Sequence, residues 1–170
     1  MAYLPIQVAN TLIEKFHDQR IDPMKLQKLL YFANGWWLAL KGEPLLTEKP
    51  QVWRYGPVYK SIYHAFRKYG RGAIDAPEPA SPFGGEPNRV PTTDVDTIKL
   101  LDWIWSEYGS KSGPVLSDET HKPGTPWRNI AEREKFRVKD NEVIPTDADW
   151  KYFADLAQER GFPTQQYAGS

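Results

Sequence analysis

One stretch decides the fold: Asp22-Pro-Met-Lys-Leu-Gln-Lys-Leu-Leu-Tyr-Phe-Ala-Asn-Gly-Trp-Trp-Leu-Ala-Leu-Lys41. It opens with two helix-start signals, because the Asp22 side chain can accept a backbone N–H and Pro23 takes a position that needs no donor. It closes at Lys41-Gly42, where a cation meets the negative end of a helix and glycine can adopt the left-handed cap. We therefore predict a helix over about 22–41.

Apolar residues line two sides of this predicted helix. The broader line has the three- and four-residue steps of one helical face and contains Leu26, Leu29, Leu30, Ala33, Trp36, Trp37 and Leu40. A narrower line, Met24, Tyr31 and Leu38, lies on the opposite side. A helix that is apolar on two sides is either central in a bundle or covered by a partner, and we favour the central position.

The rest of the chain indicates a mainly α fold, a single compact helical domain over residues 1–160. Residues 51–55 alternate apolar and polar and predict a short extended or β element. Residues 70–92 hold five prolines and four glycines and predict a long irregular loop. Residues 161–170 are expected to form a flexible tail. Further helices are predicted at about 5–18, 58–69, 93–108, 114–121, 126–136 and 146–157.

Composition excludes several classes of chemistry. The 170 residues include no cysteine, which excludes disulfides, thiolate metal sites and a cysteine nucleophile. His17, His64 and His121 form no metal-binding pair, and no glycine-rich phosphate motif is present, so we expect neither a metal nor a cofactor. The N-terminus does not resemble a signal peptide, and no apolar run approaches the roughly 18 residues of a membrane span. We expect a soluble cytoplasmic protein.

Charge is balanced overall but unevenly distributed. The chain has 22 basic and 22 acidic residues, yet Lys49 to Ile74 contains six Lys or Arg and no Asp or Glu. The stripe could be an ordinary solvated face, although solvated faces usually mix signs. If it binds a partner, an acidic protein is favoured over nucleic acid, because the chain is neutral overall. Arginine, tyrosine and tryptophan also dominate binding hot spots, although Arg54 could instead form an ion pair at the edge of the core. The predicted partner-binding residues are Trp53, Arg54, Tyr55, Lys60, His64, Arg67, Lys68 and Arg71.

Two other functions stay open at this point. Asp118 and His121 are one helical turn apart, the spacing at which a carboxylate can orient a general base for a hydrolase-like enzyme. No nucleophile motif accompanies them, so we favour a structural role for His121 at a helix end. A DNA-binding autoregulator ranks third, because the chain is neutral and shows no helix-turn-helix pattern.

Four separated motifs resemble those of the Panacea domain, which defines the SocA-like antitoxin family. Proteins of this family are associated with phages and mobile elements, and some are encoded in prophages. The first is Pro23-Met-Lys-Leu-Gln-Lys-Leu-Leu-Tyr-Phe-Ala-Asn-Gly-Trp36, and the second is Trp53-Arg-Tyr-Gly-Pro-Val58. Then follow Ser61-Ile-Tyr-His-Ala-Phe66 and Leu116-Ser-Asp-Glu-Thr-His121 with Pro126-Trp127. The resemblance runs from about Leu4 to Phe153.

This resemblance implies a helical, non-enzymatic interaction module of a toxin–antitoxin system. Members of the family neutralise unrelated toxin proteins, and one acts as a proteolytic adaptor that delivers its toxin to the ClpXP protease. The expected partners are therefore a cognate toxin and, secondly, a ClpXP-type protease, with no membrane and with DNA ranked below protein; the sequence does not decide the homo-oligomeric state. Motif residues expected to be structural are Asp22, Pro23, Lys25, Leu26, Gln27, Lys28, Tyr31, Gly56, Pro57, Thr120, His121, Pro126 and Trp127.

Overall fold

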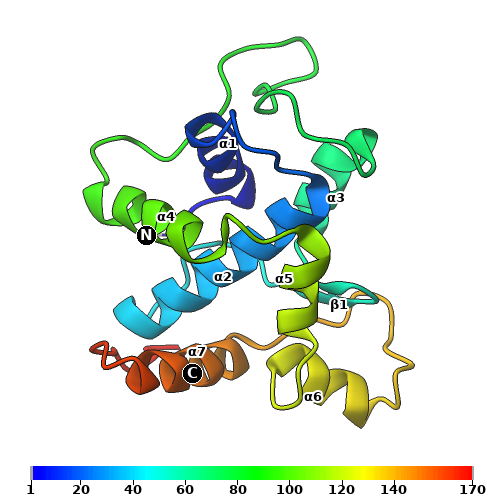
Figure 1. Cartoon of the computed structure of the whole chain (residues 1–170), viewed down its shortest axis with the longest axis vertical. Helices are drawn as coiled ribbons and strands as arrows, with labels where there is room; N and C mark the ends of the chain where they lie inside the picture. Colours follow the sequence, from blue (N-terminus) through cyan, green and yellow to red (C-terminus); the bar gives the residue numbers. More distant parts are fainter. Residues whose placement is uncertain (1, 170) are drawn as a thin grey trace.

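The computed structural model describes residues 2–169 and is mainly α, as predicted (Figure 1). A two-stranded antiparallel hairpin and a short 3-10 turn, η1 (Arg67–Tyr69), accompany the helices. The strands are β1 (Gln51–Trp53) and β2 (Gly56–Val58), with Val52 opposite Pro57. The helices are α1 (Pro5–Lys15), α2 (Pro23–Lys41), α3 (Lys60–Phe66), α4 (Val95–Tyr108), α5 (Gly113–Thr120), α6 (Pro126–Arg133) and α7 (Thr146–Glu159).

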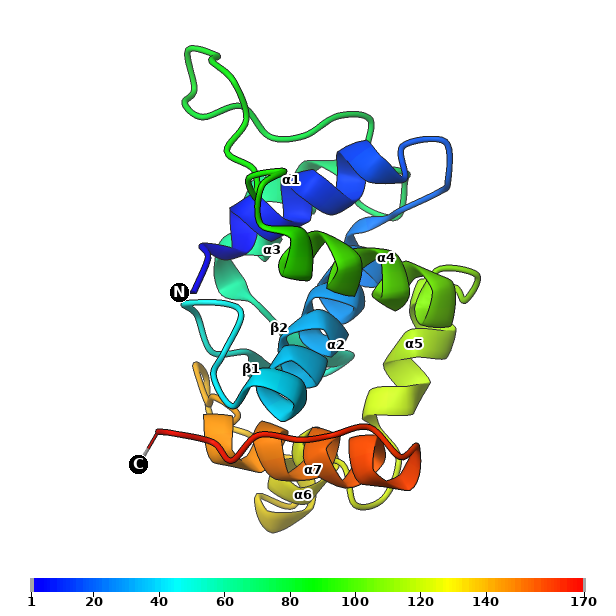
Figure 2. The same ribbon diagram turned by 90° about the vertical axis from the view of Figure 1, so that its left-hand side faces the viewer.

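Helix α2 is the centre of the molecule, and both views show it surrounded by the other helices (Figures 1 and 2). Asp22 caps its first turn by accepting the Lys25 N–H, and Gly42 ends it in the left-handed conformation. Both predicted apolar lines are covered, since Leu26 and Leu38 are fully buried. Its main neighbours are α7, α5 and α4. The predicted central position of this helix is therefore confirmed.

Close contact between α2 and α7 depends on a glycine in the middle of α2. A Cβ atom at Gly35 would lie 2.1 Å from the ring of Phe153, which is fully buried on α7. The same interface holds a buried polar pair, in which the Tyr31 hydroxyl donates to Asp149 Oδ1 at 2.6 Å. Burial raises the pKa of the Asp149 carboxyl to about 8.

Three predicted helices are shorter than expected. The helix expected at 5–18 ends at Lys15, and the following residues 16–19 form a turn. The helix expected at 58–69 begins only at Lys60, because Gly56 to Val58 pair with β1 and their backbone is extended. It ends at Phe66 and continues as η1, so the basic residues beyond Phe66 do not lie on an α-helical arc. The helix expected at 126–136 ends at Arg133, and Lys135 and Phe136 take positive φ angles.

The two irregular segments differ in how they are placed. Residues 70–92 form a loop that projects beyond α1 and α3 in both views (Figures 1 and 2). Of the expected flexible tail, 161–170, residues 161–169 lie along α7 and reach the end of α2, where Gln165 N donates to Ala39 O and Trp150 Nε1 donates to Gln165 O, and residue 170 lies outside the described residues. Flexibility of this tail stays a prediction. Across residues 2–169, no helix has both the length and the apolar character needed to cross a membrane.

Candidate protein-binding surface

The hairpin turn is held from one side by α5 and α6. Side chains of these helices meet three consecutive backbone carbonyls: Trp127 Nε1 donates to Trp53 O at 2.8 Å, His121 Nε2 lies 3.3 Å from Arg54 O, and Ser117 Oγ donates to Tyr55 O at 2.6 Å. The turn backbone is therefore fixed while its side chains remain free to face outward.

Helix α2 holds the other side of the hairpin. The Gln27 amide accepts from Tyr59 N at 2.8 Å and donates to Tyr59 O at 3.1 Å, as a neighbouring strand would. Lys28 Nζ donates to Pro57 O at 3.0 Å. Gly56 makes this approach possible, since a Cβ there would lie 2.7 Å from Lys28 Cε and its φ is 114°.

Lys28 is the most unusual charged residue of this arrangement. Its side chain is among the fully buried ones, and within residues 2–169 no ion pair engages it. Burial lowers the pKa of the Lys28 ammonium to about 7, because desolvation penalises the charged form. The lysine thus acts as a hydrogen-bond donor to the hairpin.

His121 serves the hairpin as well. Its Nδ1 lies 2.6 Å from Ser117 O, its Nε2 faces Arg54 O, and its ring packs edge-on against Trp127 at 3.9 Å between centroids. Both ring nitrogens therefore face backbone carbonyls. Among the described residues no hydrogen bond or ion pair joins the ring to the Asp118 carboxylate, which was the pairing considered for a general base.

The predicted partner-binding residues lie in two places, the hairpin turn at 53–55 and the segment 60–71. Arg54 and Tyr55 project from the turn, with 58% of Tyr55 exposed, and Trp53 packs on Tyr63 at 4.8 Å between ring centroids. Further along the chain the predicted one-signed stripe is interrupted, since Lys68 forms a 2.8 Å ion pair with Glu78. The remaining predicted residues, Lys60, His64, Arg67 and Arg71, are exposed.

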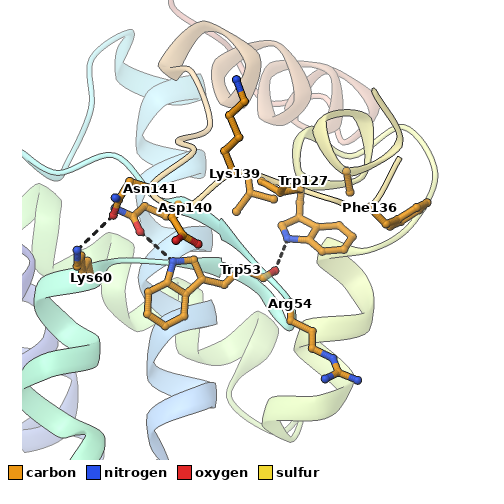
Figure 3. A pocket seen from close by; sticks show the side chains of 12 residues that line it. Trp53, Arg54, Lys60, Trp127, Phe136, Lys139, Asp140 and Asn141 are labelled. Atoms are coloured by element: carbon orange, nitrogen blue, oxygen red, sulfur yellow. Dashed lines mark hydrogen bonds between the residues drawn. The ribbon is translucent and has the colours of Figure 1, made fainter. Parts of the chain in front are cut away.

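A groove opens beside the hairpin (Figure 3). Its volume is about 810 Å³, and its walls come from β1, from α6 and from residues 136–141. The lining residues include three cations, Arg54, Lys60 and Lys139, and one carboxylate, Asp140, so the groove has an excess of positive charge. The lining residues are Gln51, Val52, Trp53, Arg54, Lys60, Trp127, Ala131, Phe136, Val138, Lys139, Asp140 and Asn141.

The segment 136–141 was not predicted as part of the site. Phe136 and Asn141 adopt positive φ angles, 60° and 65°, which non-glycine residues rarely take. Asn141 Oδ1 accepts from Lys60 Nζ at 3.2 Å, which ties this segment to α3. Its proximity to the hairpin results from chain topology, and no local sequence pattern signals it. Within residues 2–169 no cluster of three or more His, Asp or Glu could hold a metal ion.

Comparison with known proteins identifies the family. A family model described as antitoxin SocA-like, Panacea domain, matches residues 26–128, which is more than half of the chain. The chain belongs to the SocA-like antitoxin family.

One curated relative is Antitoxin SocA of Caulobacter vibrioides. It is 34% identical over 128 residues, which cover 73% of this chain and 68% of the relative. No solved structure matches. Membership of the SocA-like family supports an antitoxin role for this chain and implies a toxin partner in general.

Proposed function

We propose that this chain neutralises a cognate toxin by binding it directly through the hairpin surface, defined as Trp53, Arg54, Tyr55 and the groove beside them. One observation carries the proposal. The carbonyls of residues 53–55 are all engaged by side chains of α5 and α6, while the side chains of Arg54 and Tyr55 are exposed.

A fixed turn of this kind suits binding for a physical reason. Ordering side chains and loops at an interface costs roughly 0.5–1.5 kcal/mol for each immobilised flexible side chain, and backbone fixed in advance lowers the total. Arg, Tyr and Trp are the types that most often dominate hot spots. The positive excess of the groove favours an acidic surface on the toxin, which would speed encounter and fix orientation.

The test is a charge reversal on this surface. The cognate toxin would first be identified by co-purification with the tagged chain from its own host. The double variant Arg54→Glu, Lys60→Glu would then be co-expressed with this toxin, and binding would be measured on purified proteins. We expect growth rescue to be lost and binding to weaken at least about tenfold, while the melting temperature falls by no more than about 2 °C, since both side chains are exposed and the Lys60 hydrogen bond to Asn141 that is lost lies at the surface. Lys99→Glu is the control, because it changes the charge of an exposed residue on α4. A folded double variant that rescues growth as well as the Lys99→Glu control would contradict the proposal.

Binding could neutralise the toxin by covering its active surface or by delivering it to a ClpXP-type protease. The two modes differ in one measurable quantity, the lifetime of the toxin after protein synthesis is stopped. Delivery predicts a short toxin lifetime that depends on both this chain and the protease. Occlusion predicts an inactive toxin whose lifetime this chain does not shorten.

A further inference from the structure

The loop over residues 70–92 is anchored to α1 by a buried asparagine. Asn10 is fully buried and uses both ends of its amide, because Nδ2 donates to Glu78 O at 3.2 Å and to Asn88 O at 3.0 Å, while Oδ1 accepts from Glu78 N at 2.9 Å. Next to it, Thr11 Oγ1 accepts from Val90 N at 2.9 Å. Residues 79–87 therefore leave α1 and return to it at one place. We call this segment the finger.

The tip of the finger is ordered by its own hydrogen bonds. Ser81 N donates to Gly84 O at 3.2 Å, and Gly84 N donates to Ser81 O at 3.0 Å. Phe83 N also donates to Ser81 Oγ at 3.2 Å. Gly84 and Gly85 take φ angles of 100° and 105°, which side-chain-bearing residues rarely adopt. The turn therefore presents Phe83 at its apex.

Phe83 is the most exposed large apolar residue described, at 100% exposure. A single exposed apolar side chain is ordinary on protein surfaces. Here, however, the backbone beneath it is ordered before any partner binds, and residues 79–85 carry no charge. An uncharged projecting tip with an aromatic end fits an apolar pocket on another protein, because burying a phenylalanine side chain is strongly favourable.

The base of the finger carries a different chemistry. Lys68 and Glu78 neutralise each other at 2.8 Å. Arg67 and Arg71 are exposed beside them, and no ion pair engages either one within residues 2–169. Asp75 in the same segment is also exposed and outside the described ion pairs, so these three residues leave an excess of one positive charge, which complements acidic groups on the rim of a pocket that receives the tip.

We propose that Phe83 is the anchor of a second contact with the toxin, and that it inserts into an apolar pocket with an acidic rim. This inference rests on the proposed function, since it takes the toxin as the partner. The hairpin surface and the finger are then two separate parts of one interface.

The experiment uses the whole chain and the purified cognate toxin, identified by co-purification as above. Binding is measured by calorimetry for the wild type, Phe83→Ala, Phe83→Leu and Val115→Ala, and the melting temperature of each variant is recorded. We expect Phe83→Ala to weaken binding by about 10- to 100-fold, which is the value of one buried aromatic side chain. Phe83→Leu should restore most of the affinity. Val115→Ala, which trims an exposed apolar residue on α5, should bind as the wild type does.

The remaining outcomes separate a failure of the finger inference from a failure of the proposed function. If the wild type binds the toxin and Phe83→Ala binds within about twofold of it, the finger inference is overturned and the proposed function stands. If the wild type does not bind the toxin, both are overturned. Sedimentation of this chain alone tests a second copy as the occupant, and a dimer that Phe83→Ala abolishes would also overturn the inference.

Discussion

At the scale of single residues, Lys28 shows how a charged side chain can serve structure. A buried lysine without a carboxylate partner is costly when charged, and its pKa of about 7 leaves it partly neutral near physiological pH. Sequence could not reveal this, because lysine is rarely buried and the helical pattern gave only its position. The burial results from the hairpin lying across α2, which no local pattern predicts.

We predict that the contribution of Lys28 to stability depends on pH. The unfolded chain keeps its lysine protonated up to about 10.5, whereas the folded chain releases that proton near pH 7. The unfolded state therefore binds more protons between these values, and stability rises with pH at up to about 1.4 kcal/mol per pH unit. The check is the free energy of unfolding of the wild type relative to Lys28→Met from pH 6 to 10.

The Met variant is the matched control because Asp149 has the opposite effect. The folded chain holds the Asp149 proton up to about pH 8, while the unfolded chain loses it near 3.8, so the contribution of Asp149 falls between these values. Both proteins contain Asp149, and this trend cancels in their difference. A difference that stays constant from pH 7 to 10 would show that Lys28 does not titrate in this range.

At the scale of the elements, α2 was predictable because its signals are local. The leucines and tryptophans lie within the helix, and the cap residues Asp22 and Gly42 flank it directly in sequence. The start of α3 was not predictable, since residues 56–58 pair with β1 and strand pairing overrides helical propensity there. The position of a helix boundary depends on such tertiary contacts, whereas the presence of a long, well-capped helix can be predicted from its own sequence.

Gly35 gives a prediction that contradicts helix propensity. Replacing a mid-helix glycine with alanine normally stabilises by about 1 kcal/mol. Here the new methyl group would meet the Phe153 ring, so we expect Gly35→Ala to destabilise the fold by about 1–3 kcal/mol, measured by urea unfolding. Phe153→Leu should reduce the penalty of Gly35→Ala in the double variant. A more stable Gly35→Ala protein would show that α7 can move away from α2 without cost.

At the scale of the whole molecule, the candidate site combines parts that are distant in sequence. The aromatic and cationic residues at 53–60 were predicted from composition and charge. Their neighbours, Trp127 of α6 and the segment 136–141, are joined to them only by folding. The groove therefore could not be predicted from sequence, although one of its walls was.

The C-terminal segment offers a test of the whole-molecule packing. Gln165 N and Ala168 N donate to Ala39 O and Gly42 O, which are carbonyls at the end of α2 that lack intrahelical partners. Deleting residues 164–170 should lower the melting temperature by about 2–4 °C, because about 1 kcal/mol of contacts is lost. Gln165→Pro, which removes one donor, should give a smaller loss. An unchanged melting temperature would support the flexible tail expected from the sequence.

The Asn10 anchor has a consequence for how this protein can change over evolution. Because Glu78 and Asn88 are fixed at one place on α1, the chain between them is a closed loop. Changing the length of a closed loop costs little, since doubling it adds only about 0.6 kcal/mol. Mutations and insertions between the two anchored residues can therefore accumulate without unfolding the core. A lineage could exchange this segment and present a different exposed tip on an unchanged scaffold.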